Sequence, residues 1–266
     1  MTVHDWRVAL AHALGDAAPR DRVLRRAVVL ESVASTQDVA RDPVHPAGTV
    51  VTALRQHAGR GRLGRSWLDT ADHGLAVTIV LPDVAPEELA IRAALAAADA
   101  VRAHLPPGVA GACGIKWPND VVVDGRKLAG VLCERCDGRS LVGIGINVAQ
   151  REFPPELAPH AASLAMLDGT ADRLQVLLTL VDTVDASFRR DWDVAVDSYR
   201  SLDRMTGRTC AFQTPSGPVE GRVRRLDPLR GIEVETEFGV QFLPAATTSV
   251  VPPPGPGRYG GVDAQA

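Results

Sequence analysis

A run of glycines and arginines over residues 56–67, QHAGRGRLGRSW, has the composition of an anion-binding segment. Glycine lets the backbone approach a ligand closely and present its N–H groups, and arginine offers a planar fork that matches phosphate or carboxylate. Such a segment could wrap an anion, and its glycines would let it open and close. Taken alone, the run also fits a solvated turn or an RGG-like nucleic-acid segment, so its meaning depends on companions elsewhere in the chain.

Lysine is rare in this chain, and both lysines fall within one short stretch. The 29 lysine and arginine residues include only two lysines, Lys116 and Lys127, in the segment KWPNDVVVDGRKLAG. An ammonium is compact and a guanidinium is planar, so the two cations are not interchangeable at a binding site. The two lysines therefore indicate a site that does not accept arginine, with chance clustering as the alternative.

Glycines within strand-like segments add a third group of candidate site residues. Gly130 follows Lys127 closely, and Gly143 and Gly145 alternate in the segment GIGINV. A glycine inside a strand marks a close approach by a ligand or by another part of the chain. Together with the cations, these glycines predict a site for a small molecule and a phosphate. The chain has neither the P-loop spacing nor a GxGxxG sequence that opens a helix, which argues against a Walker or Rossmann nucleotide site.

The ordered motifs ST, QxxGRGRxGRxW, KWPND, RKLAG and GIGINV resemble those of the biotin protein ligases, also called biotin–acetyl-CoA-carboxylase ligases. The resemblance runs from about residue 28 to residue 251. It implies an α+β fold, a mixed β-sheet with flanking helices like that of class II aminoacyl-tRNA synthetases, followed by a small SH3-like β-barrel. It also implies a two-step reaction. Biotin's carboxylate attacks the α-phosphorus of MgATP to give biotinyl-5′-AMP, which then acylates one lysine of a biotin carboxyl carrier protein domain.

The resemblance also implies roles for individual residues. Lys116, Arg60 and Arg62 would be catalytic, because a carboxylate that attacks a polyphosphate needs positioned cations. The implied biotin-binding residues are Ser35, Thr36, Gln37, Gln56, Arg60, Gly61, Arg62, Lys116, Gly130, Gly143 and Gly145. The implied ATP- and adenylate-binding residues are Arg62, Arg65, Trp67, Lys116, Asn119 and Asn147. The family commonly has asparagine at the position of Gln37, so that contact differs here.

The implied cofactors are ATP, biotin as a substrate, and Mg²⁺ held by phosphate oxygens and water, so no protein metal ligands are assigned. The implied partner is the carrier protein domain, and a homodimer is compatible with the resemblance. Some family members also carry an N-terminal DNA-binding domain. Only 34 residues precede Ser35 here, and they hold one expected helix and one expected strand. We therefore expect a monofunctional enzyme with no DNA partner.

Composition narrows the classes of protein that remain. The 266 residues are 45% hydrophobic and 23% charged, which excludes a disordered chain. A net charge of -3 disfavours a dedicated duplex-DNA binder. No apolar run approaches the roughly 20 residues of a spanning helix, and no signal peptide begins the chain, so no membrane partner is expected. Four cysteines without a regular framework indicate reduced thiols and a cytoplasmic location.

Periodicity and turn signals predict the elements that must position these residues. Near-continuous apolar runs predict strands over residues 25–33, 48–54, 74–82 and 141–148. Helices are expected over residues 6–14, from residue 35, over 86–104 and over 174–192, with a shorter helix to about residue 200. A hairpin at Asp124-Gly125 follows strand pieces at 115–117 and 121–123 and leads into a strand over 127–134.

The pattern changes near residue 203, where short strands alternate with the turn sequences TPSGP, DPLRG and EFG. Turn signals at this close spacing predict a small β-barrel. We therefore expect a catalytic domain over residues 1–202, an SH3-like domain over 203–251 and a disordered, Pro/Gly-rich tail over 252–266.

Two other functions fit parts of this pattern. A lipoate ligase or octanoyltransferase has a related fold and also uses a lysine, and competition by free lipoate would distinguish it. A non-catalytic nucleic-acid or peptide-binding module could use the arginine run and the barrel, and salt-sensitive RNA binding without ATP turnover would support it. Cys133 and Cys136 form a CxxC sequence, but no second pair or histidine cluster completes a zinc site.

Overall fold

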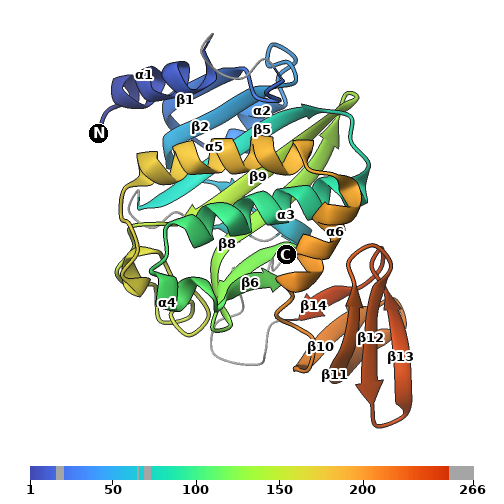
Figure 1. Ribbon diagram of the computed structural model, residues 1–266. Helices are drawn as coiled ribbons and strands as arrows, with labels where there is room; N and C mark the ends of the chain where they lie inside the picture. Colours follow the sequence, from blue (N-terminus) through green and yellow to red (C-terminus); the bar gives the residue numbers. More distant parts are fainter. Residues whose placement is uncertain (16–20, 65, 69–72, 252–266) are drawn as a thin grey trace, which may run out of the picture.

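The computed structural model describes residues 1–15, 21–64, 66–68 and 73–251 (Figure 1). Arg65 and the predicted tail over residues 252–266 lie outside the described residues. None of the helices in these ranges is long and apolar enough to cross a membrane. The framework is a mixed β-sheet with flanking helices, as the α+β prediction requires, followed by a smaller antiparallel sheet.

The larger sheet has seven strands in the order β1-β2-β5-β9-β8-β7-β6. Strand β1 is parallel to β2, and the other neighbouring pairs are antiparallel. The parallel pair is connected through the short helix α2 (Thr36–Ala40), whose first residues belong to the ST motif. The strands are β1 (Arg26–Val33), β2 (Thr49–Gln56), β5 (Gly74–Pro82), β6 (Cys113–Lys116), β7 (Asp120–Val123), β8 (Arg126–Cys136) and β9 (Arg139–Asn147).

Most of the helical mass covers one face of this sheet, with α3 and α5 lying across it (Figure 1). The alanine-rich middle of α3 is fully buried, which lets its backbone pack closely over β8 and β9. Helices α5 and α6 pack against α3, and α1 packs against β1. The helices are α1 (Val3–Leu14), α3 (Pro86–Ala103), α4 (Pro107–Ala110), α5 (Arg173–Arg189) and α6 (Trp192–Ser201), with a short 3-10 turn at Ala165–Leu167.

The opposite face of the sheet carries α2 and a second, smaller apolar cluster. Val50 of β2 belongs to the main core under the helices, and its neighbour Val51 packs with Ala40 and Val80 on the α2 side. This alternation is the period of two that a strand imposes on its side chains. On β9 the same alternation turns Gly143 toward the α2 face. The sheet is therefore covered by helices on one side and is available for a site on the other.

The two helices expected over residues 174–192 and on to about residue 200 are both present, but the break between them comes earlier, because an aspartate begins the second one. Asp191 has extended backbone geometry and its side chain accepts hydrogen bonds from the backbone N–H groups of Asp193 and Val194. This N-cap interaction starts α6 while α5 ends at Arg189. The periodicity of apolar residues continues through the break, which is why the first helix was predicted to end at residue 192 and not at Arg189.

The C-terminal segment forms a five-stranded antiparallel sheet in the order β13-β12-β11-β10-β14, compatible with an SH3-like domain. The strands are β10 (Thr209–Thr214), β11 (Gly217–Asp227), β12 (Gly231–Thr236), β13 (Gly239–Pro244) and β14 (Ser249–Val251). The glycine and arginine run is a small hairpin in its described part, with β3 (Gly59–Arg60) paired to β4 (Ser66–Trp67) around a 3-10 turn at Arg62–Gly64.

Candidate active site

Two adjoining pockets lie on the α2 face of the large sheet, and we call them the inner and outer chambers. They share the wall residues Gly61, Arg62, Trp67, Asn119 and Lys127. The inner chamber is also lined by Ser35, Thr36, Gln37, Gln56, Arg60, Ala76, Val77, Thr78, Gly130, Val131, Leu132, Gly143, Ile144 and Gly145. The outer chamber is also lined by Ser66, Leu68, Lys116, Trp117, Pro118, Asp120, Asn147, Phe153, Leu157, Ala161, Ser249 and Val250.

All the predicted site residues within the described ranges line one chamber or both. Lys116 and Asn147 line the outer chamber alone, whereas Arg60 lines the inner chamber and not the outer. Lys116, predicted to contact both biotin and ATP, therefore lines only one of the two chambers. Arg65, predicted to contact the nucleotide, lies outside the described residues.

The closed end of the inner chamber is a buried cluster of hydroxyl and amide groups. Ser35 caps α2 by accepting a hydrogen bond from the Gln37 N–H. The Gln56 side-chain oxygen accepts from the Thr36 N–H at 2.8 Å and from the Thr36 hydroxyl at 3.1 Å. Thr78 Oγ1 lies 2.9 Å from Thr36 Oγ1 and 3.1 Å from Gln37 Oε1. These bonds fix donors and acceptors at one end of an otherwise apolar pocket.

One buried polar atom in this cluster lacks a protein partner. Gln37 is 3% exposed, its Oε1 accepts from Thr78, and its Nε2 makes no hydrogen bond to any residue that the structure describes. A buried amide N–H without a partner is destabilising by roughly 1–3 kcal/mol, so such a group in a pocket wall is suited to a ligand acceptor. Gln37 therefore reaches the inner chamber.

Three strand glycines make room for side chains of the site. A Cβ at Gly143 would lie 2.6 Å from Gln37 Oε1, and one at Gly145 would lie 2.3 Å from the Trp67 indole. A Cβ at Gly130 would lie 2.9 Å from the Lys127 ammonium. The sequence predicted close approach at these positions, and the closest neighbours are these three side chains. Each glycine therefore sets the position of one functional group.

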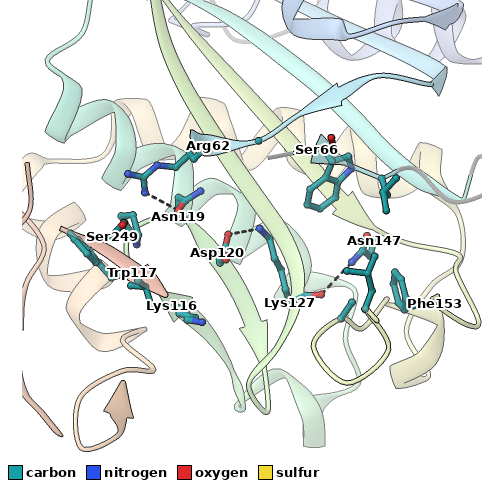
Figure 2. Close-up of a pocket in the computed structure, with 17 residues that line it drawn as sticks. Arg62, Ser66, Lys116, Trp117, Asn119, Asp120, Lys127, Asn147, Phe153 and Ser249 are labelled. Atoms are coloured by element: carbon teal, nitrogen blue, oxygen red, sulfur yellow. Dashed lines mark hydrogen bonds and ion pairs between the residues drawn. The ribbon is translucent and has the colours of Figure 1, made fainter. Parts of the chain in front are cut away.

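Lys127 lies at the junction of the two chambers. Its ammonium is 2.6 Å from Asp120 Oδ1 and 5.5 Å from the centroid of the Trp67 ring (Figure 2). The carboxylate and the ring face both interact favourably with the ammonium at this position. The sequence noted Lys127 for its rarity but assigned it no role.

Asparagines fix the strands and cations that form the shared wall. Asn119 donates through Nδ2 to the Val131 carbonyl at 2.6 Å and accepts from the Arg62 guanidinium at 3.1 Å (Figure 2). Asn147 donates to the carbonyls of Lys127 and Ala162 at 3.2 and 3.1 Å. The two asparagines therefore hold Arg62 and the backbone of Lys127 in place, in addition to lining the chambers.

Arg60 is held at the inner chamber by two carboxylates. Its guanidinium is 2.9 Å from Asp38 Oδ1 and 3.3 Å from Glu134 Oε2, and Arg41 lies 2.8 Å from the same Glu134 oxygen. These groups tie the first strand of the glycine and arginine hairpin to α2 and β8. In this arrangement, Arg60 shapes the inner chamber without reaching the outer one.

The outer chamber combines cations with an apolar wall contributed by distant segments. Lys116 and Asp120 come from the KWPND turn, Phe153 from the segment after β9, and Ser249 from β14 of the C-terminal sheet (Figure 2). The Tyr199 hydroxyl donates a hydrogen bond to the Pro118 carbonyl at 3.1 Å and so stabilises the KWPND turn. Burial raises the pKa of Tyr199, so it stays a neutral donor.

Several lining residues were missed at the sequence level. Thr78 was visible as the polar member of an otherwise apolar strand, and Asp120 as part of KWPND. No sequence signal marked Phe153 or Ser249, because their place depends on how remote segments pack. Burial raises the pKa of the Cys133 thiol of the CxxC sequence to about 12, and the described residues contain no cluster of three metal-ligating side chains.

Comparisons with known proteins agree with this geometry. A family model described as the biotin/lipoate A/B protein ligase family matches residues 29–150. A biotin–[acetyl-CoA-carboxylase] ligase of Mycobacterium tuberculosis is 35% identical over 192 residues, covering 68% of this chain and 70% of the relative. One of Paracoccus denitrificans is 33% identical over 213 residues, covering 74% and 88%. A solved structure titled as a biotin protein ligase from Aquifex aeolicus with biotin and ATP has a TM-score of 0.75 and 28% identity, covering 85% of this chain and 99% of that one.

Proposed function

The chain belongs to the biotin/lipoate A/B protein ligase family, and we propose that it is an ATP-dependent biotin protein ligase. The observation that carries the proposal is the wall shared by the two chambers, which contains the cations Arg62 and Lys127. An acid bound in one chamber and a nucleotide bound in the other would meet at this wall. That is the geometry a reaction between a carboxylate and a phosphate needs.

We assign biotin to the inner chamber. Biotin has a ureido head that both donates and accepts hydrogen bonds, an apolar ring and chain, and a terminal carboxylate. The buried cluster around Gln37 and Thr78 matches the head, and Leu132 and Trp67 offer an apolar wall. The carboxylate would then point toward the shared wall.

We assign ATP to the outer chamber. Trp67, Phe153 and Val250 provide aromatic and apolar surface for the adenine, and Lys116 provides a cation for the phosphates. Arg62 and Lys127 lie where the α-phosphate would approach the carboxylate. Their positive charge offsets the repulsion between two anions and the negative charge that builds on the α-phosphoryl oxygens.

The first step forms biotinyl-5′-AMP. A carboxylate oxygen of biotin attacks the α-phosphorus, a new oxygen–phosphorus bond forms, and the bond to the bridging oxygen breaks to release pyrophosphate. In the second step, a lysine amine of a carrier protein attacks the acyl carbon, giving an amide and releasing AMP and a proton. Enclosure by Trp67 and the hairpin that begins at Gly59 would shield the mixed anhydride from water between the steps.

Mg²⁺ fits this site as a partner of the ATP phosphates. Asp120 is the one carboxylate among the described residues that line the outer chamber, and it provides the hard oxygen donor that Mg²⁺ prefers. The ion would be held mainly by phosphate oxygens and water, and when bound it neutralises phosphate charge. The residues of the chain act beside it, with Asp120 also orienting Lys127.

The remaining assignments concern domains and partners. We place catalysis in residues 1–202 and an SH3-like unit in residues 203–251, supported by the separate five-stranded sheet that begins at Thr209. The carrier domain is the macromolecular substrate, and the four free cysteines fit a cytoplasmic reaction. Sedimentation velocity with and without biotin and ATP tests the homodimer.

Biotin-dependent ATP–pyrophosphate exchange with Mg²⁺ tests the proposal, with lipoate and no acid in parallel. Exchange with biotin alone supports it. Exchange with lipoate alone would retain the chemistry but contradict the assignment of the inner chamber. Absence of exchange with either acid would overturn the proposed activity. Thr78→Val, which removes one hydroxyl from the inner chamber, should weaken biotin binding, whereas the matched variant Thr214→Val in the C-terminal sheet should not.

A further inference from the structure

The chain between the two sheets runs as an added strand along the edge of the large sheet. The Ile115 N–H donates to the Leu202 carbonyl at 2.6 Å, and the Arg204 N–H donates to the Ile115 carbonyl at 3.0 Å. Asp203 forms a parallel bridge with Ile115 between these bonds. This segment therefore attaches the C-terminal sheet to β6, the strand that ends at Lys116.

The Arg204 guanidinium strengthens this attachment by donating hydrogen bonds to several backbone carbonyls. Its Nε donates to the Ala112 carbonyl at 3.2 Å, and one terminal nitrogen donates to the carbonyls of Gly111 and Cys113 at 2.9 and 2.8 Å. A planar guanidinium with five N–H donors can bind several acceptors at once, whereas a lysine ammonium lacks this fork. One side chain thus fixes the backbone that leads into β6.

Gly114 is the position that permits this contact. A Cβ there would lie 2.3 Å from the Leu202 carbonyl oxygen and 2.7 Å from the Cγ of Arg204. Both distances are below ordinary van der Waals contact, and the nearer atom is backbone, so the added strand would have to move. Arg204 and Gly114 therefore form a matched pair across the junction.

This junction also affects which residues line the outer chamber. Lys116 follows Gly114 by two residues, and the C-terminal sheet begins at Thr209, five residues after Arg204. The edge strand β14 of that sheet places Ser249 and Val250 in the wall of the outer chamber, on the same side as Lys116 (Figure 2). No residue of the C-terminal sheet lines the inner chamber among the described residues. The position of the sheet thus shapes one chamber and leaves the other unchanged.

We propose that Arg204 is a positioning residue for the nucleotide: by bonding the carbonyls of residues 111–113 it holds β14 against the outer chamber, so that ATP affinity depends on it and biotin affinity does not. The proposal rests on the assignment of ATP to the outer chamber and biotin to the inner one. It gives the C-terminal sheet a defined part in nucleotide binding.

Calorimetric titration of the full chain with Mg²⁺-ATP, and separately with biotin, tests this without turnover. The variants are Arg204→Met, which keeps the aliphatic stem, Arg204→Lys, which keeps the charge, and Gly114→Ala, which displaces the added strand. The matched control is Arg224→Met, because Arg224 lies on the C-terminal sheet and pairs with Glu235 on that same sheet. We expect about a tenfold or greater rise in the ATP dissociation constant for Arg204→Met and Gly114→Ala, a smaller rise for Arg204→Lys, and biotin affinity within about twofold of the parent chain.

Equal weakening of ATP and biotin, or unchanged ATP affinity, would overturn the positioning role. If Arg204→Met does not fold, the comparison of Arg204→Lys with the parent chain decides the question by the same criterion. The proposed activity fails separately, when the parent chain shows no exchange with biotin although it binds ATP. A parent chain that binds no ATP would overturn both proposals.

Discussion

Replacement of Lys127 by methionine removes the ammonium at the junction of the chambers while keeping an unbranched side chain of similar length. In the structure, this ammonium lies 2.6 Å from Asp120 Oδ1 and within reach of both chambers. The substitution has two electrostatic effects. It removes a cation from the place where two anions meet, and it leaves the Asp120 carboxylate without this partner in the phosphate chamber.

The expected magnitude follows from Coulomb's law. Two unit charges about 4 Å apart interact by about 4 kcal/mol at an effective dielectric constant of 20. Asp120 already neutralises part of the ammonium charge, so we expect the transition state to lose about 2–3 kcal/mol, which corresponds to roughly a 30- to 160-fold slower exchange. Because the unpaired carboxylate contributes to this loss, Asp120→Asn in the Lys127→Met background should restore part of the rate.

The assay is biotin-dependent ATP–pyrophosphate exchange at saturating ATP, with biotin affinity measured separately by calorimetry. A double-mutant cycle over Lys127 and Asp120 separates the coupling of the pair from its effect on catalysis. An exchange rate for Lys127→Met within threefold of the parent chain would refute the reasoning. The double variant exchanging more slowly than Lys127→Met would refute the role given to Asp120.

Three further changes probe other parts of the site and the core. Gly143→Ala places a Cβ where the Gln37 amide lies, so biotin affinity should fall about tenfold with ATP affinity unchanged, and titration that shows equal losses would contradict this. Lys116→Arg should keep the parent melting temperature yet lose about tenfold or more of the exchange rate, because a guanidinium cannot occupy the same compact position. Burial raises the pKa of the Cys113 thiol from 9.0 to about 11, so it stays protonated where the unfolded thiol ionises. The free energy of unfolding should therefore fall as pH rises from about 9 to about 11, by up to about 3 kcal/mol, and Cys113→Ala should flatten that slope in denaturant titrations.

Local patterns in the sequence were sufficient for most of the fold. Apolar runs predicted β2, β5 and β9 to within a few residues, because strands that are buried on both faces contain few polar residues. The glycine and arginine run was recognised by composition, yet its β3–β4 pairing was not, since two-residue strands have no periodicity to read. The sequence also did not predict that the site is divided into two chambers, because Ser249 and Phe153 line the outer chamber only as a result of tertiary packing.

The place of Lys127 shows why alternation along a strand could not assign this residue to the site. Strict alternation along β8 would put Lys127 on the same face as Ala129 and Val131, which pack in the core under the helices. The register of β7 with β8 instead shifts at this point, and Leu128 and Ala129 both face that core. The bulge therefore turns Lys127 and Gly130 to the same side, where their atoms lie close together. A sequence motif can indicate that the lysine of RKLAG is special, but one extra residue in the strand decides that it points into the site.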